Sequence, residues 1–543
     1  MKRIQIYDTT LRDGSQGEDI SFSVDDKLHI AKKLDDLGID YIEGGWPGSN
    51  LKDMAFFRRV CELTLNHTRI AAFGSTAHPK NSKVEDDNNL QALVEAGTPV
   101  VTIFGKTWDL HVRVALGITL ERNLELIRDS VAYLKSLGKE IIYDAEHFFD
   151  GFKADRGYAL ATLQAAERAG ADTIVLCDTN GGTLAEEIRD RLLAAMQSVK
   201  TPLGIHTHND SDMAVANSII AIRHGATQVQ GTFNGYGERC GNANLCSIIP
   251  NIELKLGMTA IGRDKLSDLT AVSHYVSEIA NMHHRQDFPF VGKSAFAHKG
   301  GIHVSAVMKE ASAYEHIAPE LVGNQRRVLI SELSGKSNVL YKAERMGLEI
   351  DKASPGTQAV VNKLKEMEHY GYQFEGAEAS FEILFNKLMN QHNEFFELDG
   401  FRVITERKGN RESTSEAVIK LRVDGTEEHT AAEGVGPVSA LDHALRKSLT
   451  TFFPSIKDIR LTDYKVRVLN AKGATDAKVR VLIETSDGHE TWGTVGVSEN
   501  LIEASWLALV DSITYKLKKE YGFKNKDEAK TQSSRSEAPK SKA

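Results

Sequence analysis

The sequence predicts an α/β protein whose amino-terminal half is a (β/α)₈ TIM barrel. Eight short apolar runs with strand character recur between residues 4 and 233, and segments with helical spacing of apolar residues separate them. Polar and acidic residues also gather at the ends of these runs, where barrel enzymes carry their active sites. An open, doubly wound sheet is the alternative fold that the same alternation allows.

The runs and the segments between them define the expected elements one by one. Two of the helical segments, 25–38 and 120–138, each end in a glycine that can adopt the left-handed cap conformation. The predicted strands are IQIYDTT (4–10), IDYIEGG (39–45), RIAAFGS (69–75), PVVTIFG (99–105), KEIIYDAE (139–146), DTIVLCDT (172–179), PLGIHTHND (202–210) and TQVQGTF (227–233).

The pattern of apolar residues changes after the barrel, and the sequence as a whole predicts four regions. Residues 1–256 form the barrel, and 257–400, where helical patterns dominate, form helical linker subdomains. Residues 401–522 mix alternating strands with two helix candidates, which predicts an α+β domain. The tail 523–543 is almost free of aromatic and large aliphatic side chains and is expected to be disordered.

Composition excludes several classes of partner. The balance of 66 Lys and Arg against 75 Asp and Glu gives a formal charge of −9, which argues against nucleic acid as the main partner. The four cysteines form no Cys-x-x-Cys pair, which favours a reducing compartment. The chain shows neither a secretory apolar stretch nor a run of about 18 apolar residues, so we expect a cytoplasmic protein without membrane contact.

The motif HTHND at the end of the seventh predicted strand indicates a metal site. His206 and His208 are two residues apart, so both side chains point to the same face of the strand. Asp13, which follows the first strand, is the best-placed carboxylate to complete a site of two histidines and one carboxylate for a divalent metal. The alternative is that both histidines simply make hydrogen bonds on a polar loop.

The residue before Asp13 is Arg12, and an arginine there can face an anionic oxygen of a substrate. A structural salt bridge at the barrel mouth is the alternative. Other polar side chains follow the remaining strands, namely Asp8, Glu43, Asp144, Glu146, Asp178, Thr179 and Asn234. So many polar strand ends on one rim are difficult to explain by solvation alone.

The glycine-rich segment NGYGERCGNANL (234–245) lacks the spacing of either nucleotide-binding glycine motif. We expect it to position Glu238, Arg239 and Asn242 near the barrel mouth, with the Asn242 carbonyl oxygen available to the metal. Cys240 has no activating histidine nearby in sequence, so a packed thiol is favoured over a nucleophile.

Four motifs in order resemble the metal-dependent Claisen-condensing enzymes, the family of 2-isopropylmalate, homocitrate and citramalate synthases. They are DTTLRDGSQ (8–16), HTHND (206–210), GYGERCGNANL (235–245) and FAHKGGIH (296–303). Segments 431–445 and 491–509 resemble the carboxyl-terminal regulatory domain of this family. Segments 144–151 and 369–382 are most similar to the bacterial citramalate synthase branch.

The resemblance implies an acyltransferase whose acyl group becomes an alkyl group on transfer. In the citramalate branch, acetyl-CoA condenses with pyruvate and the thioester is hydrolysed to (R)-citramalate and CoA, a step toward isoleucine. The resemblance also implies a divalent metal cation (Mn, Mg or Zn), a homodimer and feedback by an amino acid, isoleucine in this branch.

The roles of the family carry over to matching positions of this chain. Asp13, His206, His208 and Asn242 hold the metal; Arg12, Asp144 and Thr179 contact the 2-oxo acid; Arg12, Glu146, His303 and Tyr314 carry the catalysis. Two departures stand out: Val304 and Ser305 replace a polar residue and an aspartate, and Asp144 replaces a small residue. The rival interpretations are a 2-isopropylmalate synthase, a lyase similar to 3-hydroxy-3-methylglutaryl-CoA lyase, and a non-enzymatic amino-acid sensor.

Overall fold

The computed structural model describes residues 2–329, 341 and 355–522, apart from 82, 375, 389–393, 408, 410–411 and 470–476. The predicted tail 523–543 lies outside the described residues. The chain divides into two compact units. The first comprises Met1–Ala297 and Glu315–Arg326, and the second comprises His298–Tyr314 and the chain from Arg327 onward.

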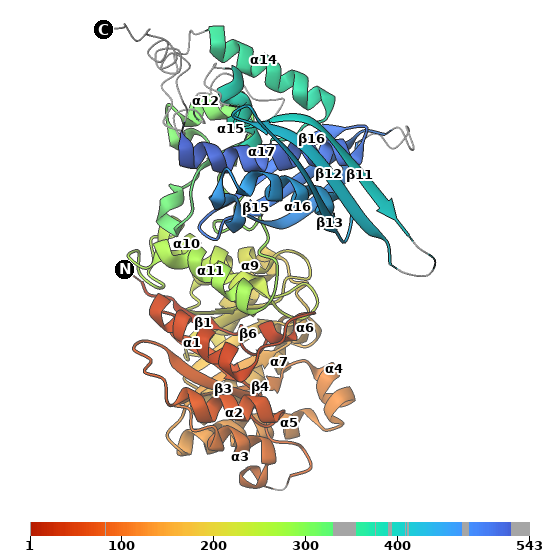
Figure 1. Cartoon of the computed structure of the whole chain (residues 1–543). Helices are drawn as coiled ribbons and strands as arrows, with labels where there is room; N and C mark the ends of the chain where they lie inside the picture. Colours follow the sequence, from red (N-terminus) through yellow and green to blue (C-terminus); the bar gives the residue numbers. More distant parts are fainter. Residues whose placement is uncertain are drawn as a thin grey trace, which may run out of the picture. The chain divides into compact units, whose positions relative to one another are not determined.

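The first unit contains a closed barrel of eight parallel strands that follow one another in chain order, which confirms the predicted fold (Figure 1). The barrel closes where the first strand pairs with the eighth, with Gln5 opposite Gln228. The strands are β1 (Gln5–Asp8), β2 (Tyr41–Gly45), β3 (Arg69–Ser75), β4 (Val100–Lys106), β5 (Glu140–Glu146), β6 (Thr173–Asp178), β7 (Leu203–Thr207) and β8 (Gln228–Gly231).

Amphipathic helices alternate with the strands. In α1, Ser23 forms a capping box with Asp26, Leu28 and Leu34 are buried, and Gly38 ends the helix in the left-handed conformation with φ 96°. The helices of this unit are α1 (Val24–Leu37), α2 (Leu51–Val60), α3 (Asn88–Glu95), α4 (Asp109–His111), α5 (Leu120–Ser136), α6 (Phe148–Ala154), α7 (Arg156–Ala169), α8 (Ala185–Ser198), α9 (Ala214–His224), α10 (Leu245–Pro250) and α11 (Leu269–Ile279).

The barrel has two separate apolar regions. The larger lies between the strands and the surrounding helices. The smaller is contributed by the strands alone and comprises Tyr7, Tyr41, Ala71, Val100, Ile142, Val175 and Cys177. Because these side chains come from strands distributed round the barrel, they form a packed layer of its interior. The interior is therefore filled, and the polar residues collect at the carboxyl ends of the strands.

The second unit begins with short elements and two longer helices. They are β9 (Ala297–His298), α12 (Gly301–Val307), β10 (Arg327–Val328), α14 (Pro355–Tyr370) and α15 (Glu378–Leu388). Two repeats of three antiparallel strands and a helix follow, as the sequence predicted for an α+β domain. The first comprises β11 (Glu397–Glu406), β12 (Thr414–Val423), β13 (Thr426–Gly434) and α16 (Pro437–Thr450); the second comprises β14 (Arg460–Val468), β15 (Val479–Ser486), β16 (Thr491–Ser498) and α17 (Leu501–Tyr521).

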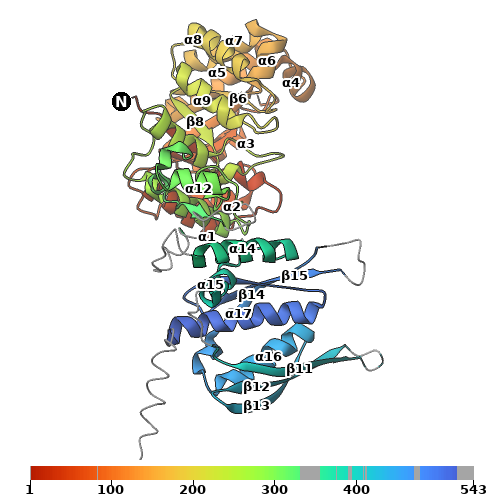
Figure 2. The same cartoon turned by 90° about the horizontal axis from the view of Figure 1, so that it is seen from above.

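Each repeat packs its helix on its own sheet, and α16 also contacts α17 (Figure 2). Leu441 and Leu445 of α16 and Trp506 and Leu509 of α17 belong to one apolar core, so the two repeats fold as one body. Among the described residues, no helix combines the length and the apolar character needed to cross a bilayer.

Strand β13 has only a weak strand signal in its sequence. Its sequence TEEHTAAEG has few residues that favour strands, yet it pairs with β12 from Thr426 to Gly434 and packs against α16. Asp424 and Gly425 both have positive φ, 47° and 81°, which is the conformation of a two-residue type I′ hairpin turn. The Asp-Gly pair was the sequence signal for this hairpin.

Candidate metal centre and active site

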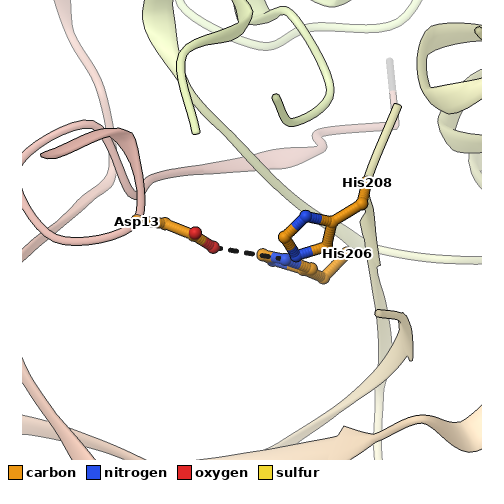
Figure 3. A group of neighbouring side chains, drawn as sticks. All are labelled: Asp13, His206 and His208. Atoms are coloured by element: carbon orange, nitrogen blue, oxygen red, sulfur yellow. Dashed lines mark ion pairs between the residues drawn. The ribbon is translucent and has the colours of Figure 1, made fainter. Parts of the chain in front are cut away.

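The carboxyl ends of β1 and β7 bring Asp13, His206 and His208 together at one point of the barrel mouth (Figure 3). One potential ligand atom from each lies within 4.8 Å of the others, and all three residues are buried. His206 Nε2 is 3.5 Å from Asp13 Oδ2. This is the arrangement expected of two imidazoles and a carboxylate that share a cation.

The backbone around the cluster is held at several points. Thr9 N–H donates to Gly231 O at 2.8 Å, and Gly14 N–H donates to Thr9 O at 3.0 Å, so the turn that carries Asp13 is tied to the end of β8. His208 forms an antiparallel bridge with Asn242 of the glycine-rich segment. The glycine-rich segment therefore lies beside His208.

A hydrogen-bond chain orients the His206 ring. Gln230 Nε2 donates to Asp144 Oδ1 at 3.0 Å, which leaves Gln230 Oε1 to accept from His206 Nδ1 at 2.9 Å. A proton on Nδ1 leaves the Nε2 lone pair directed toward Asp13. Gln230 thus selects the tautomer that a metal ligand needs.

Two buried polar atoms beside the cluster have no hydrogen-bond partner in the described structure, His208 Nδ1 and Asn242 Oδ1. The Asn242 amide donates through Nδ2 to Tyr236 O at 3.3 Å, so its carbonyl oxygen is the free atom. Buried polar atoms without a partner are costly, and a bound cation is one partner that can satisfy an acceptor such as the Asn242 carbonyl oxygen. The buried donor set of Asp13, His206 and His208 therefore fits a divalent metal.

The protonation states also suit a cation. Burial would raise the pKa of Asp13, but Arg12 and the two imidazoles hold it below its ordinary value. Burial lowers the pKa of His206, and burial together with His206 lowers the pKa of His208 to about 3. At neutral pH the site consequently presents one carboxylate and two neutral imidazoles.

Arg12 lies next to the cluster and is rigidly held. Its Nε donates to Glu43 Oε1 at 2.5 Å, Nη1 is 3.5 Å from Asp13 Oδ2, and Cζ lies 3.7 Å from the centre of the Phe73 ring. Burial would lower the pKa of Arg12, but the Glu43 and Asp13 carboxylates raise it above its ordinary value. The guanidinium is a fixed positive charge beside the candidate metal position.

The two acids inside the barrel, Glu43 and Asp144, differ in their hydrogen-bond partners. Glu43 accepts from Tyr7 Oη at 2.8 Å and from Arg12, whereas Asp144 accepts only from Gln230 among the side-chain hydrogen bonds of the described residues. Burial and the Glu43 carboxylate raise the pKa of Asp144 well above its ordinary value. Asp144 therefore keeps its proton to a higher pH than an exposed aspartic acid does, whereas Glu43, whose pKa burial also raises, is paired with Arg12.

Two further predicted residues occupy adjacent strand ends. Glu146 ends β5, and its Oε2 forms an ion pair of 2.5 Å with Lys106 Nζ at the end of β4. Thr179 follows β6, and its Oγ1 accepts from His147 N–H at 2.9 Å, which leaves the hydroxyl hydrogen available to another acceptor. Both residues lie on the rim that carries the candidate metal ligands.

His303 and Tyr314 belong to the second unit. His303 lies in α12, and its ring stacks on the Tyr314 ring with centroids 4.2 Å apart. Their proposed share in catalysis therefore rests on the resemblance to the family, which for His303 is the motif FAHKGGIH.

Gln230 and Lys106 were not among the predicted site residues. Gln228 and Gln230 sit two residues apart in a short buried strand, and polar side chains at alternate positions of a barrel strand point inward. Lys106 ends β4 as Glu146 ends β5, and the two residues are register partners. Both residues could be seen in the sequence as polar positions of predicted strands. Only the pairing of the strands shows which side chains Gln230 and Lys106 contact.

Family models cover most of the chain. The HMGL-like model matches residues 3–276, the homocitrate synthase post-HMGL domain-like model matches 290–371, and the LeuA allosteric (dimerisation) domain matches 375–517. The barrel and its strand-end site thus define an enzyme of the HMGL-like class.

Full-length relatives narrow this class. The chain is 56% identical to an (R)-citramalate synthase of Geobacter sulfurreducens over 96% of this chain and 98% of the relative. It is 54% identical to an (R)-citramalate synthase of Aquifex aeolicus over the same shares. A 2-isopropylmalate synthase of Methanocaldococcus jannaschii is 30% identical over 94% of each chain. The chain belongs to the (R)-citramalate synthase family.

The lowered histidine pKa values predict how metal affinity depends on pH. Groups that stay neutral as the pH falls do not compete with the cation for protons, so the affinity for Mn²⁺ should change less than about threefold between pH 8 and pH 6. Two histidines of ordinary pKa near 6.5 would instead lose more than about tenfold. Titration of the metal-free protein by electron paramagnetic resonance distinguishes these outcomes.

The Gln230 hydrogen bonds predict the effect of removing them. Gln230→Leu should weaken Mn²⁺ binding by about 10- to 100-fold, because the His206 ring loses its orienting partner. Gln228→Leu is the matched control, since Gln228 is buried in the same strand but neither of its amide atoms has a partner among the described residues. Equal affinity of both variants would show that Gln230 does not position the ligand.

Proposed function

We propose that this chain condenses acetyl-CoA with pyruvate and hydrolyses the thioester, forming (R)-citramalate and CoA. The observation that supports this proposal most directly is the buried cluster of Asp13, His206 and His208, with Arg12 beside it. The cluster lies on the barrel of a member of the citramalate synthase family. For the methyl carbon of a thioester to attack a keto group, the keto group must be polarised and a base must be positioned to remove a methyl proton. The rim of this barrel offers groups for each task.

Asp13, His206, His208 and Asn242 would hold a divalent cation through one carboxylate oxygen, two imidazole nitrogens and one amide oxygen. When bound, such a cation supplies Lewis acidity that polarises the keto group of a 2-oxo acid. Mn, Mg and Zn are the candidate metals.

Arg12 faces the keto oxygen and stabilises the negative charge that develops there, because its guanidinium is fixed by Glu43 before substrate binds. Thr179 donates its free hydroxyl hydrogen to the substrate carboxylate. Asp144, whose pKa is raised by burial and by the Glu43 carboxylate, borders the space for the substrate side chain. A protonated acid there avoids repulsion between its carboxyl group and the anionic 2-oxo acid.

Glu146 accepts the proton that leaves the methyl group of acetyl-CoA. The Lys106 ammonium holds the Glu146 carboxylate in one orientation, at 2.5 Å. His303 and Tyr314 act on the water that hydrolyses the thioester, and their stacked rings keep the two groups together. Hydrolysis releases CoA and makes the condensation difficult to reverse.

The remaining parts of the chain fit a regulated biosynthetic enzyme of the cytoplasm. We assign catalysis to the barrel 1–256, a linker role to 257–400 and binding of a feedback amino acid to 401–522. Support for the last assignment is the match of 375–517 to the LeuA allosteric (dimerisation) domain. The same match supports a homodimer, and isoleucine is the proposed effector.

The second candidate function is 2-isopropylmalate synthesis from 2-oxoisovalerate. Relatives with that name match at 30–31% identity, whereas five relatives named (R)-citramalate synthase match at 43–56%. Substrate preference is the measurement that separates the two functions.

A thiol-release assay with acetyl-CoA and a panel of 2-oxo acids tests the proposal. Pyruvate should exceed 2-oxoisovalerate in kcat/KM by at least tenfold, about 1.4 kcal/mol in transition-state binding. Chelation of divalent metal should abolish thiol release, as should Asp13→Ala. The opposite substrate preference would favour 2-isopropylmalate synthesis, and full activity after complete metal removal would contradict the mechanism.

A further inference from the structure

The glycine-rich segment after β8 carries an arginine that the proposed reaction does not use. Arg239 has a φ of 58°, in the left-handed region of backbone conformation. A side chain as large as that of arginine seldom occurs there, because its Cβ crowds the backbone. Residues in this conformation persist where surrounding contacts hold them, and such positions cluster at functional sites. The contacts of Arg239 are therefore informative.

The Arg239 guanidinium contacts the ends of two neighbouring strands at once. Its Nε donates to Asp210 Oδ1 at 2.7 Å and its Nη2 donates to Asp210 Oδ2 at 3.0 Å, so two parallel hydrogen bonds hold this carboxylate. Nη2 also donates to the backbone carbonyl oxygen of Thr179 at 2.7 Å. Thr179 follows β6 and Asp210 follows β7. Arg239 thus joins the segments after β6, β7 and β8.

The hydrogen bonds of Arg239 use most of its donors. The Nε hydrogen and both Nη2 hydrogens are directed at Asp210 and Thr179, and Nη1 has a longer contact of 3.4 Å with Glu238 Oε2. The Asp210 carboxylate also balances the positive charge. A guanidinium paired in this way connects protein segments, whereas an arginine that binds an anionic ligand keeps its planar fork of donors for that ligand.

The three segments that Arg239 joins also lie close together along their backbones. Gly181 has a φ of 63°, and a Cβ at this position would lie 2.5 Å from Asp210 Oδ2. Ser211 N–H donates to Gly181 O at 3.1 Å, and Asn209 N–H donates to Gly241 O at 2.9 Å. These backbone contacts join the segments in pairs. Arg239 is the side chain that contacts the outer two, through Thr179 O on one side and its own segment on the other.

Each segment carries a different part of the candidate site. Thr179 has the free hydroxyl hydrogen that the proposed function directs at the substrate carboxylate. His208 and Asn242 lie beside the candidate metal position. A 2-oxo acid that contacts both the metal and Thr179 binds tightly only when the two contacts are held at a suitable separation before it arrives.

We propose that Arg239 is a positioning residue that holds Thr179 in place relative to the metal ligands and thereby strengthens binding of the 2-oxo acid carboxylate. Arg239 contacts Thr179 through its own carbonyl oxygen and Asp210 two residues beyond His208. It acts through Thr179 and does not touch the substrate. The effect on the 2-oxo acid rests on the proposed function, whereas the contacts of Arg239 do not depend on it.

Isothermal titration calorimetry of the full-length protein loaded with Mn²⁺, without acetyl-CoA, tests this role. Pyruvate and 2-oxoisovalerate are titrated, and the one that the unaltered protein binds more tightly is the probe. Arg239→Met should weaken the probe at least about tenfold, as should Thr179→Val, because each loses a hydrogen bond to a charged group. Adding Arg239→Met to Thr179→Val should change the affinity less than about twofold, since the arginine acts through that hydroxyl.

Arg189→Met is the matched control. Arg189 of α8 is also an arginine paired with an aspartate, Asp190, and its side chain is 43% exposed compared with 39% for Arg239. It should bind the probe as the unaltered protein does. Electron paramagnetic resonance verifies that each sample is saturated with Mn²⁺, and thermal unfolding verifies the fold.

Arg239→Lys serves if Arg239→Met does not fold or does not hold the metal, because it keeps a positive charge beside Asp210. Lysine lacks the planar fork, so the probe should still bind at least about threefold more weakly.

Probe affinity of the folded Arg239 variant within about twofold of the unaltered protein would overturn the inference. So would a double variant at least about fivefold weaker than Thr179→Val, which would mean that Arg239 acts independently of Thr179. A raised KM for acetyl-CoA with unchanged 2-oxo acid affinity would also overturn it, as would a protein that binds neither 2-oxo acid. Thiol release is measured on the same samples. Probe binding without thiol release would count against the proposed reaction and leave the role of Arg239 standing.

Discussion

The active site depends on the convergence of one carboxylate and two imidazoles in a buried space at the carboxyl ends of the barrel strands. Asp13 and His206 come within 3.5 Å although they lie far apart in the sequence, because β1 and β7 flank β8 in the closed barrel. Grouping polar acceptors away from water costs free energy unless a partner satisfies them. The unpartnered atoms of His208 and Asn242 show that the described protein groups alone do not provide that partner.

The surroundings keep this centre in one electrostatic state. Arg12 is balanced by Glu43, which in turn accepts from Tyr7, and the Asp144–Gln230 pair orients His206 from the other side. The barrel interior therefore contains linked hydrogen bonds around the candidate metal position, and His208 Nδ1 and Asn242 Oδ1 beside it have no hydrogen-bond partner among the described residues. Catalysis in the proposed reaction uses a charge distribution that exists before substrate arrives.

Much of this could be predicted from the sequence, for reasons that differ between residues. The eight strands were recognisable because each is a short apolar run bounded by turn residues, and His206 and His208 were recognisable because period-2 geometry places them on one face. Gln230 and Lys106 were not recognisable as site residues. The role of a polar residue in a strand depends on which residue of the next strand it contacts, and the sequence alone does not give that pairing.

The central claim is that a divalent cation binds between Asp13, His206 and His208. The most direct test is a crystal structure of the protein with Mn²⁺, with the ion located by its anomalous scattering. We expect one strong peak at about 2.0–2.3 Å from Asp13, His206 and His208, with the Asn242 oxygen also directed at it. A peak elsewhere, or three side chains hydrogen-bonded to each other with no ion among them, would contradict this claim.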